Sequence, residues 1–288
     1  MRIKIISACL LVIISLTSCA EESLLGGRLV YGLANYVYAF DTTTQRTELL
    51  YEAPYGEIVG DLTVVDEDRI LFSSHRRKSD IIELNLKTRT EKKVHKGSHP
   101  AYIRKHGMLF FYDRPEGATH TRLYVGRLDD LLGSLHEVDE GPFVLAQQVI
   151  QVSHDEVVFS SGRDGGSQNV WMYNIVTEKL NQLPLRNCRP KIWRAATKQL
   201  LCTDLSTGHR FFSNLEGHKG DDYPDGNLSP IVYIPSRDLL VVARARFFAF
   251  SGEVTDFVVH NIKTDKESVL LKEGAGPLGS AVWFSHQY

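Results

Sequence analysis

A short turn signal recurs along the chain, and its spacing restricts the possible fold more than any other feature of the sequence. In each copy an Asn or Asp ends an apolar run and is followed three positions later by Thr. Side chains of Asn, Asp and Thr hydrogen-bond nearby backbone groups in tight turns, so the signal predicts a turn between two strands. The four clear copies are anchored at Asp41, Asn85, Asn174 and Asn261. These anchors are 44, 89 and 87 residues apart, so the chain has a period of about 44 residues, and two weaker copies lie in the gaps.

The segments between the turn signals predict strands. They are short apolar runs rich in Val, Ile, Phe and Tyr, and almost none has the i, i+3, i+4, i+7 spacing of an amphipathic helix. A repeat of about 44 residues that is made only of strands matches one four-stranded blade of a β-propeller. The weaker turn signals are at Arg127 and Asn214. Six apolar runs mark six blades and end at Tyr31, Phe72, Phe111, Phe159, Cys202 and Val242.

The two ends of the chain predict how the ring closes. We name the strands of a blade a to d, from the inside out. The first copy begins with a b strand soon after Leu25, and the last segment, about Ser280 to Ser285, has no strand after it. Pairing this C-terminal strand into the first blade as its strand a removes two exposed sheet edges. We therefore predict an all-β fold, a six-bladed β-propeller of four-stranded blades that is closed by the C-terminal strand.

The repeats imply one domain over residues 26–288, because no low-complexity linker interrupts them and closed all-β folds of this length often form one unit. The fourth copy, SSGRDGGSQNVWMYNI at residues 160–175, has a loop rich in Ser, Arg, Asp and Gly before an apolar c strand that ends in Asn and an aliphatic residue. This pattern resembles the six-bladed TolB-like propeller family and covers essentially the whole chain after the N-terminal leader. The Ser-Pro-Asp-Gly turn typical of that family between strands a and b is absent here.

Residues 1–18 have the features of a secretion signal. Two positive charges precede an apolar core, Ile5 to Leu16, that is too short to span a bilayer. The core ends in Leu16-Thr17-Ser18-Cys19, which resembles the bacterial lipobox. The alternative is an ordinary signal peptide that happens to contain a Cys.

The lipobox resemblance implies cleavage before Cys19 and acylation of this residue, with palmitate among the acyl chains. Residues 19–25 would then be a short tether. Three acyl chains exceed the two signals that stable membrane anchoring requires. Ala20 follows the Cys, and by resemblance to lipoproteins of Gram-negative bacteria this indicates the periplasmic face of the outer membrane.

Charge and cysteine content restrict the partners and the redox state. Without residues 1–18 the chain has 31 basic and 35 acidic residues, so its balance of −4 gives no support for nucleic-acid binding. Besides Cys19, the remaining thiols are Cys188 and Cys202. In an oxidising periplasm these two can form a disulfide within the fifth blade. Two reduced, buried thiols are the alternative.

The sequence contains no motif that signals catalysis. A Gly-x-Ser-x-Gly elbow, a His-Glu-x-x-His pair, a Walker loop and a Cys-x-x-Cys pair are all absent, and the 11 His residues are dispersed. We therefore predict no cofactor and no metal. A ring can nevertheless assemble ligands from different blades, and spacing along the sequence cannot show such a site.

Arginines recur shortly after the b strands. In propellers these b–c loops share one face with the connections between blades, so the side chains should surround the same rim. The connections add His95, Lys96, His99, Arg186 and Arg189. Guanidinium groups bind carboxylates or phosphates through paired hydrogen bonds, but each Arg can equally brace its own loop, and bracing is the favoured interpretation. The arginines are Arg76, Arg114, Arg163 and Arg246.

Two classes of function remain open at this point. The first is a non-enzymatic binding or scaffold propeller, monomeric and anchored to the membrane by its lipid, that recognises a protein or an envelope glycan through its loop face. The second is an enzyme that acts on an anionic polysaccharide, similar to oligogalacturonate lyases, which are also propellers. Those lyases use a His cluster on a metal, and no local motif reproduces it here. We therefore favour binding.

Overall fold

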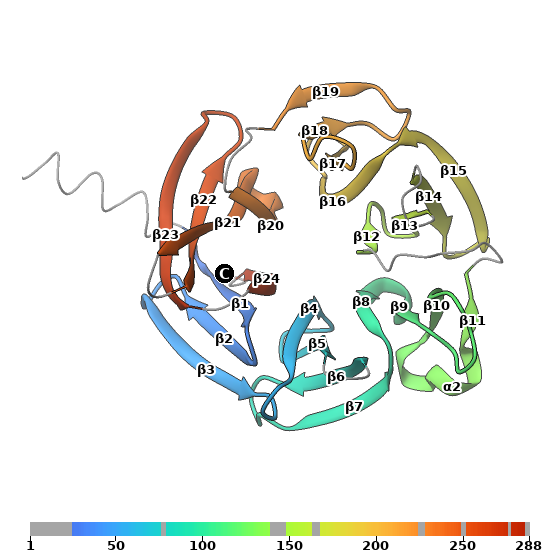
Figure 1. Ribbon diagram of the computed structural model, residues 1–288, viewed down its shortest axis with the longest axis horizontal. Coiled ribbons are helices and arrows are strands. Elements are labelled where there is room, and N and C mark those ends of the chain that lie inside the picture. Colours follow the sequence, from blue (N-terminus) through green and yellow to red (C-terminus); the bar gives the residue numbers. More distant parts are fainter. Residues whose placement is uncertain are drawn as a thin grey trace, which may run out of the picture.

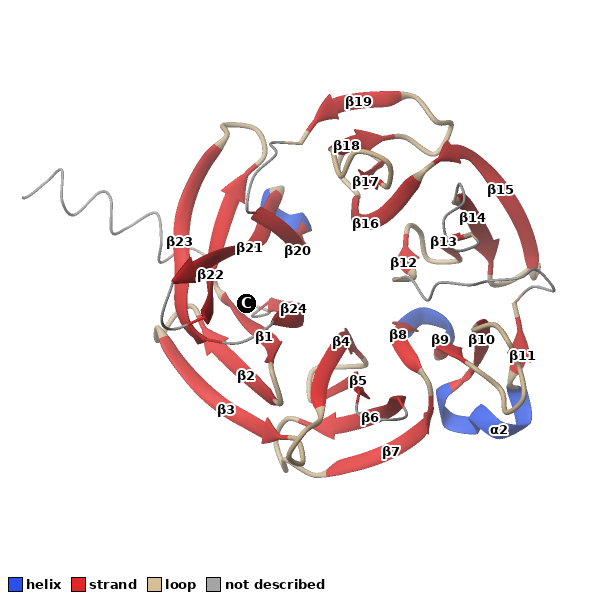
Figure 2. Ribbon diagram, viewed as in Figure 1, coloured by secondary structure: helices blue, strands red, loops and turns tan. Residues whose placement is uncertain are grey.

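The computed structural model describes residues 25–75, 79–138, 148–162, 168–223, 228–248, 252–275 and 278–285. They form six four-stranded antiparallel sheets arranged in a ring, as Figure 1 shows. This confirms the predicted six-bladed β-propeller. Figure 2 shows that the few helical turns are short and lie between strands. No helix in the described part of the chain is long and apolar enough to cross a membrane.

Each blade is described from its inner strand outward. Blade 1 contains β24 (Leu278–Ser285), β1 (Gly27–Leu33), β2 (Tyr36–Asp41) and β3 (Arg46–Glu52). Blade 2 contains β4 (Ile58–Val64), β5 (Arg69–His75), β6 (Ser79–Asn85) and β7 (Glu91–Lys96). Blade 3 contains β8 (Ser98–Ile103), β9 (Met108–Asp113), β10 (Arg122–Arg127) and β11 (His136–Glu137).

The second half of the chain repeats this order. Blade 4 contains β12 (Ile150–Gln151), β13 (Glu156–Ser161), β14 (Asn169–Asn174) and β15 (Lys179–Arg186). Blade 5 contains β16 (Cys188–Arg194), β17 (Gln199–Asp204), β18 (Arg210–Ser213) and β19 (Lys219–Asp222). Blade 6 contains β20 (Leu228–Ile234), β21 (Leu239–Phe248), β22 (Gly252–Asn261) and β23 (Lys266–Ala275).

The C-terminal strand closes the ring as predicted. β24 pairs antiparallel with β1, from Gly27 opposite Ser285 to Leu33 opposite Leu278. Gly27 is needed at this seam, because a Cβ there would lie 2.3 Å from the Trp283 ring. The inner position of the first blade is therefore filled from the far end of the sequence, and Figure 1 shows both ends in one blade.

The recurring turn signals lie between strands c and d, as their side-chain chemistry predicts. In blade 2 the Asn85 carboxamide oxygen accepts hydrogen bonds from the backbone N–H groups of Lys87 (2.9 Å) and Thr88 (2.8 Å). Asp41, Asn174 and Asn261 accept the equivalent pair of bonds. In each turn the residue four positions after the anchor has a positive φ of 53° to 59°, and these are Gln45, Arg89, Glu178 and Asp265.

The weaker copies have different turns. In blade 3 a 3-10 turn, η2 (Leu128–Asp130), and the one-turn helix α2 (Leu131–Ser134) follow β10, and the Arg127 N–H donates to Ser134 Oγ over 2.7 Å. In blade 5 Asn214 Oδ1 accepts from the His218 N–H over 2.8 Å, which keeps a side-chain cap with a different spacing.

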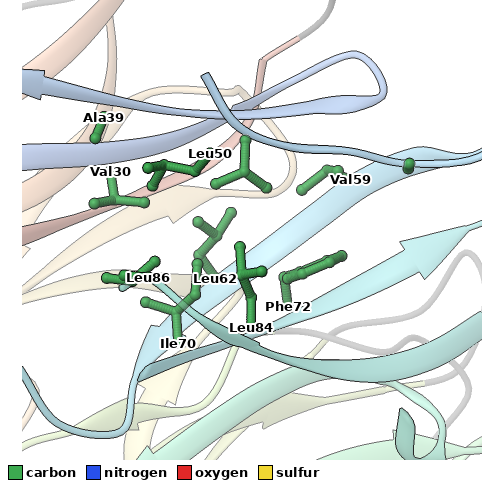
Figure 3. Close-up of a cluster of buried hydrophobic side chains, with 11 residues drawn as sticks. Val30, Ala39, Leu50, Val59, Leu62, Ile70, Phe72, Leu84 and Leu86 are labelled. Atoms are coloured by element: carbon green, nitrogen blue, oxygen red, sulfur yellow. The ribbon is translucent and has the colours of Figure 1, made fainter. Parts of the chain in front are cut away.

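The hydrophobic core lies between the blades. Strands such as β1 are buried on both faces, because each sheet packs face to face against its two neighbours. Figure 3 shows the layer between blades 1 and 2, where Val30 and Leu50 face Leu62, Phe72 and Leu84. This two-sided burial explains why the b strands read as continuous apolar runs, whereas the outer d strands are largely exposed.

Candidate functional site

The blade topology divides the loops between two faces of the ring. The a–b and c–d turns lie on one face, here called the turn face. The b–c loops and the connections between blades lie on the other, here called the loop face. The innermost strands surround the ring axis, with β4 and β16 on opposite sides of it in Figure 1. Functional side chains from different blades can therefore meet only near this axis or along one of the faces.

A bulge interrupts several of the inner strands. In β4 the two residues Gly60 and Asp61 lie opposite the single residue Ser73, because the register shifts between Val59 and Leu62. A bulge bends its strand and re-aims a side chain. Gly60 has no room for a Cβ, which would lie 2.4 Å from the His75 ring. The glycine therefore permits the arrangement that places Asp61 beside His75.

Strands β16 and β20 each have a bulge next to a proline, nearer to the a–b turn than the bulge of β4. Lys191 is the additional residue in β16, between Pro190 and Ile192. Ile231 is the additional residue in β20, after Pro230. Proline lacks a backbone N–H and is tolerated in sheets at edges and bulges. Lys191 and Ile231 are thus at equivalent positions in their blades, whereas Asp61 lies in a bulge further from the a–b turn.

Two histidines and an aspartate meet beside β4 on the loop-face side. His99 Nε2, at the start of β8, lies 3.6 Å from Asp61 Oδ2, and the His75 and His99 rings are 6.4 Å apart between centroids. His75 is held at both ring nitrogens, since Nε2 is 2.9 Å from Ser73 Oγ and Nδ1 is 2.8 Å from Ser79 Oγ. The His99 and Asp61 side chains are only 27% and 26% exposed.

Burial lowers the pKa of His75 below its ordinary value of 6.5. The neighbouring His99 acts in the same direction, and the Asp61 carboxylate opposes the shift. His75 is therefore neutral at pH 7, with one ring nitrogen as a donor and the other as an acceptor. His99 has a φ of 53°, an uncommon conformation for a residue with a side chain.

Three cationic side chains belong to blade 5, whose inner strand β16 lies across the ring axis from β4. Arg189 in β16 and Arg210 in β18 are both in register with Thr203 of β17, so the two side chains leave the same face of the sheet. Lys191 is half-buried, and burial is the main cause that lowers its pKa below 10.5. The charges of Arg189 and Arg210 lower this pKa further, and Asp61 opposes them. The Asp61 side is thus close enough to act electrostatically on the lysine.

We call Asp61, His75, His99, Arg189, Lys191 and Arg210 the axial cluster. Within the described residues, Arg189 Nε and His99 Nδ1 are buried atoms that lack a hydrogen-bond partner. Such orphaned polar atoms are uncommon in folded proteins. The cluster therefore has one side that carries a carboxylate and two imidazoles and another side that carries cations. Each side retains a buried polar atom without a hydrogen-bond partner in the described chain.

An exposed apolar surface lies on the same face of the ring. The connection from β3 to β4 carries Tyr55, which is 95% exposed, and Ile58, the first residue of β4, is 47% exposed. Ile58 is opposite His75 in the β4–β5 ladder. Large exposed side chains next to a polar cluster are typical of recognition surfaces.

Among the four arginines expected after the b strands, the structure describes the side chain of Arg114 and the backbone of Arg246. The Arg114 Nε donates to the Ala118 backbone oxygen over 3.0 Å, inside its own loop, which is the contact that a bracing role requires. The expectation that Arg246 lies in a loop is wrong, because β21 extends to Phe248 and pairs Arg246 with Val254 of β22. The hairpin of blade 6 is longer than the others, with ten residues in each of its strands. Arg76, Arg163 and Cys19 lie outside the described residues.

Of the side chains predicted for the connections, His99 and Arg189 belong to the axial cluster. Their neighbours His95, Lys96 and Arg186 have other positions, and His95 packs against the Phe111 ring with 4.9 Å between centroids. Asp61, Lys191 and Arg210 were not found from the sequence. The available signal was a Gly or Pro inside an inner-strand pattern, as in Gly60-Asp61 and Pro190-Lys191.

Cys188 and Cys202 form a disulfide in the structure, with 5.2 Å between their Cα atoms and both side chains fully buried. It joins the first residue of β16 to β17 across one blade. Its oxidation state in the cell remains a prediction. Within the described residues, no group of three or more His, Cys, Asp or Glu side chains is placed to hold a metal ion.

Comparison with known proteins identifies relatives by fold only. No family model matches the sequence, and no curated protein matches it. Among solved structures, TolB from Acinetobacter baumannii superposes with a TM-score of 0.70 at 14% identity, over 90% of this chain and 67% of that chain. An oligogalacturonate lyase in complex with manganese superposes with a TM-score of 0.54 at 12% identity, over 84% of this chain and 72% of that chain.

The fold and the comparisons define the class. This is a six-bladed β-propeller, and among six-bladed propellers it has a TolB-like fold. At these identities the likeness concerns the fold, and function has to be argued from the site.

Proposed function

We propose that this chain is a membrane-anchored, periplasmic binding or scaffold propeller that recognises a protein or an envelope component through its loop face. One observation carries the proposal: the axial cluster and the exposed Tyr55 both lie on that face. The likeness to TolB supports a binding role in the periplasm by analogy of fold. The protein acts without catalysis and as a monomer.

A cross-linking experiment tests the loop face. We expect a photo-reactive benzoylphenylalanine at position 55 to give discrete adducts in cells of the native host, because this side chain is 95% exposed on the proposed surface. The matched control is Val176, which is 64% exposed in a c–d turn and so lies on the turn face. Equal adducts from both positions, or none from position 55, would contradict recognition through the loop face.

The membrane anchor is the second part of the proposal, and the Leu16 to Cys19 signal supports it. We expect Cys19→Ala to release the protein from the membrane fraction, because the acylated thiol is lost. Cys9→Ala is the matched control, since Cys9 lies in the segment that the processing step removes. Fractionation and intact mass measure the outcome. An unchanged distribution, with no acyl mass on the wild-type chain, would refute the anchor.

An enzyme that acts on an anionic polysaccharide is the alternative, and the pair of histidines beside Asp61 favours it. The neighbouring lyase was solved with manganese, but the described residues do not fit such an ion, because they offer no group of three ligands. Metal analysis of the purified protein separates the two functions. One tightly bound divalent ion for each chain would favour the enzyme.

A further inference from the structure

We infer that the axial cluster binds an anionic sugar, whose carboxylate or phosphate group is held by Arg189 and Lys191 while its hydroxyl groups face Asp61 and the histidines. This inference rests on the proposed function, because it names the ligand class of the same face. Two observations lead to it: on one side Arg189 and Lys191 make no ion pair within the described residues, and on the other side Asp61 and two histidines offer acceptors and donors.

Arg189 and Lys191 are the two cations of the cluster that an anionic group can bind. Within the described residues, Arg189 and Lys191 make no ion pair, and the buried Arg189 Nε has no hydrogen-bond acceptor. Both guanidinium groups oppose the charged form of Lys191. An oxyanion placed between these groups would remove the mutual repulsion and accept charge-assisted hydrogen bonds, which are the strong ones. Partial burial makes each of these interactions stronger than it would be in water.

The opposite side suits hydroxyl groups. The Asp61 carboxylate accepts hydrogen bonds only, whereas the neutral His75 ring and the hydroxyls of Ser73 and Ser79 both donate and accept. His99 Nδ1 adds a further group without a partner in the described chain. A ligand with one acidic group and several hydroxyls satisfies both sides, and that is the chemistry of a sugar acid or a sugar phosphate.

The negative charge of Asp61 also selects against other anions. A long polyanion laid across the axis would place one of its charges against this carboxylate, which is partly exposed and 3.6 Å from His99. Like charges at such distances repel, and partial burial strengthens the repulsion. The site therefore accepts a single acidic group with a neutral, hydroxylated body.

Isothermal titration with three matched ligands tests the inference. D-Glucose, D-glucuronate and D-glucose 6-phosphate share one ring and differ only in the acidic group. We expect binding of at least one anionic sugar and none of glucose, with an affinity that falls as salt is raised. A preference between the two anionic sugars identifies carboxylate or phosphate as the natural group.

Two lysine variants of blade 5 complete the test. K191M should weaken binding of the anionic sugar about 10- to 100-fold, the loss expected for one charge-assisted hydrogen bond of about 1.5 to 3 kcal/mol. The variant should also fold, because it removes a desolvated charge that neighbouring cations already repel. K198M is the matched control: this lysine is exposed in the a–b turn of the same blade, on the turn face, and its loss should leave the affinity unchanged.

Three results would overturn the inference: no heat from either anionic sugar at concentrations that detect millimolar binding, equal binding of glucose, or equal weakening by K191M and K198M. The cross-linking at position 55 is measured separately. Adducts without sugar binding would refute the anion site and leave the loop face as the recognition surface. Sugar binding without adducts would refute protein recognition at Tyr55 and keep the site.

Discussion

A chain truncated after residue 277 is expected to lose the stable closed ring, which is the largest effect that we predict for any change in this protein. Strand β24 supplies the whole inner edge of blade 1. Its two faces pack in opposite directions, with Ala281 and Trp283 in the core toward blade 6 and Val282 and Phe284 in the core toward blade 2. The truncation therefore opens two interfaces between blades and exposes the edge of β1.

The lost packing free energy should be enough to unfold the ring, because the total stability of a folded domain is only about 5–15 kcal/mol. Exposed strand edges also promote association between chains. We expect the truncated protein to aggregate or to lose cooperative unfolding, as measured by size-exclusion chromatography and thermal denaturation.

Truncation after Ser285 is the matched control, since it leaves every pair of the β24–β1 ladder in place. A synthetic peptide of residues 278–288, added in trans, should restore part of the cooperative transition to the shorter chain. A monomeric chain ending at residue 277 with wild-type melting behaviour would show that β24 does not hold the ring together.

The fold could be predicted from the sequence because its signals are local. Asn85 and Asn174 determine their turns through hydrogen bonds to backbone groups two and three residues away, so the same letters recur wherever the turn recurs. The buried b strands are apolar on both faces and identify each blade. The missing inner strand of the first copy and the surplus strand at the other end of the chain then determine how the ring closes.

The axial cluster could not be predicted in the same way. Asp61 and Lys191 belong to blades on opposite sides of the ring, and each takes its position from a bulge that depends on the register of its neighbour strand. Counting along single b–c loops led to Arg114 and Arg246 instead. One of these braces its own loop, and the other lies inside a long hairpin. The sequence thus indicated the face beside which the axial cluster lies and some of its charge, but not the side chains that meet there.

Contacts between adjacent blades are a further class that sequence inspection missed. Arg194 is the last residue of β16, and Asp238 lies in the a–b turn of blade 6. The guanidinium group donates from Nε to Asp238 Oδ1 over 2.7 Å and from Nη2 to Oδ2 over 2.5 Å. Their side chains are only 10% and 7% exposed. The pair thus joins the end of the inner strand of blade 5 to the a–b turn of blade 6.

Asp238→Asn is expected to destabilise the protein by about 3–5 kcal/mol, because it leaves the Arg194 charge buried without a counter-charge. Asparagine is the informative replacement. It keeps the shape of the side chain, can still accept the 2.9 Å hydrogen bond from the Tyr233 hydroxyl, and tolerates the positive φ of 54° at this position. Chemical denaturation measures the change in the free energy of unfolding.

Asp68→Asn is the matched control for that variant. Asp68 also lies in an a–b turn and also pairs with a cation, Lys87 Nζ at 2.7 Å, but the lysine side chain is 75% exposed. An exposed pair contributes about 0–1 kcal/mol, so this variant should be nearly neutral. The double variant Arg194→Met with Asp238→Asn should recover part of the loss, since it removes both charges.

The pH dependence provides an independent test of the same pair. Hydrogen bonds from the Arg194 guanidinium are the main cause that lowers the pKa of Asp238 in the folded protein. A carboxyl group with a depressed folded pKa contributes stability that is fully present above its unfolded pKa of about 3.9 and is lost as the pH falls through the folded value. The stability difference between the wild type and Asp238→Asn should therefore be constant near pH 7 and shrink below about pH 4. A difference below about 1 kcal/mol at pH 7, similar to that of the Asp68 control, would show that the pair behaves like an exposed one and does not hold blades 5 and 6 together.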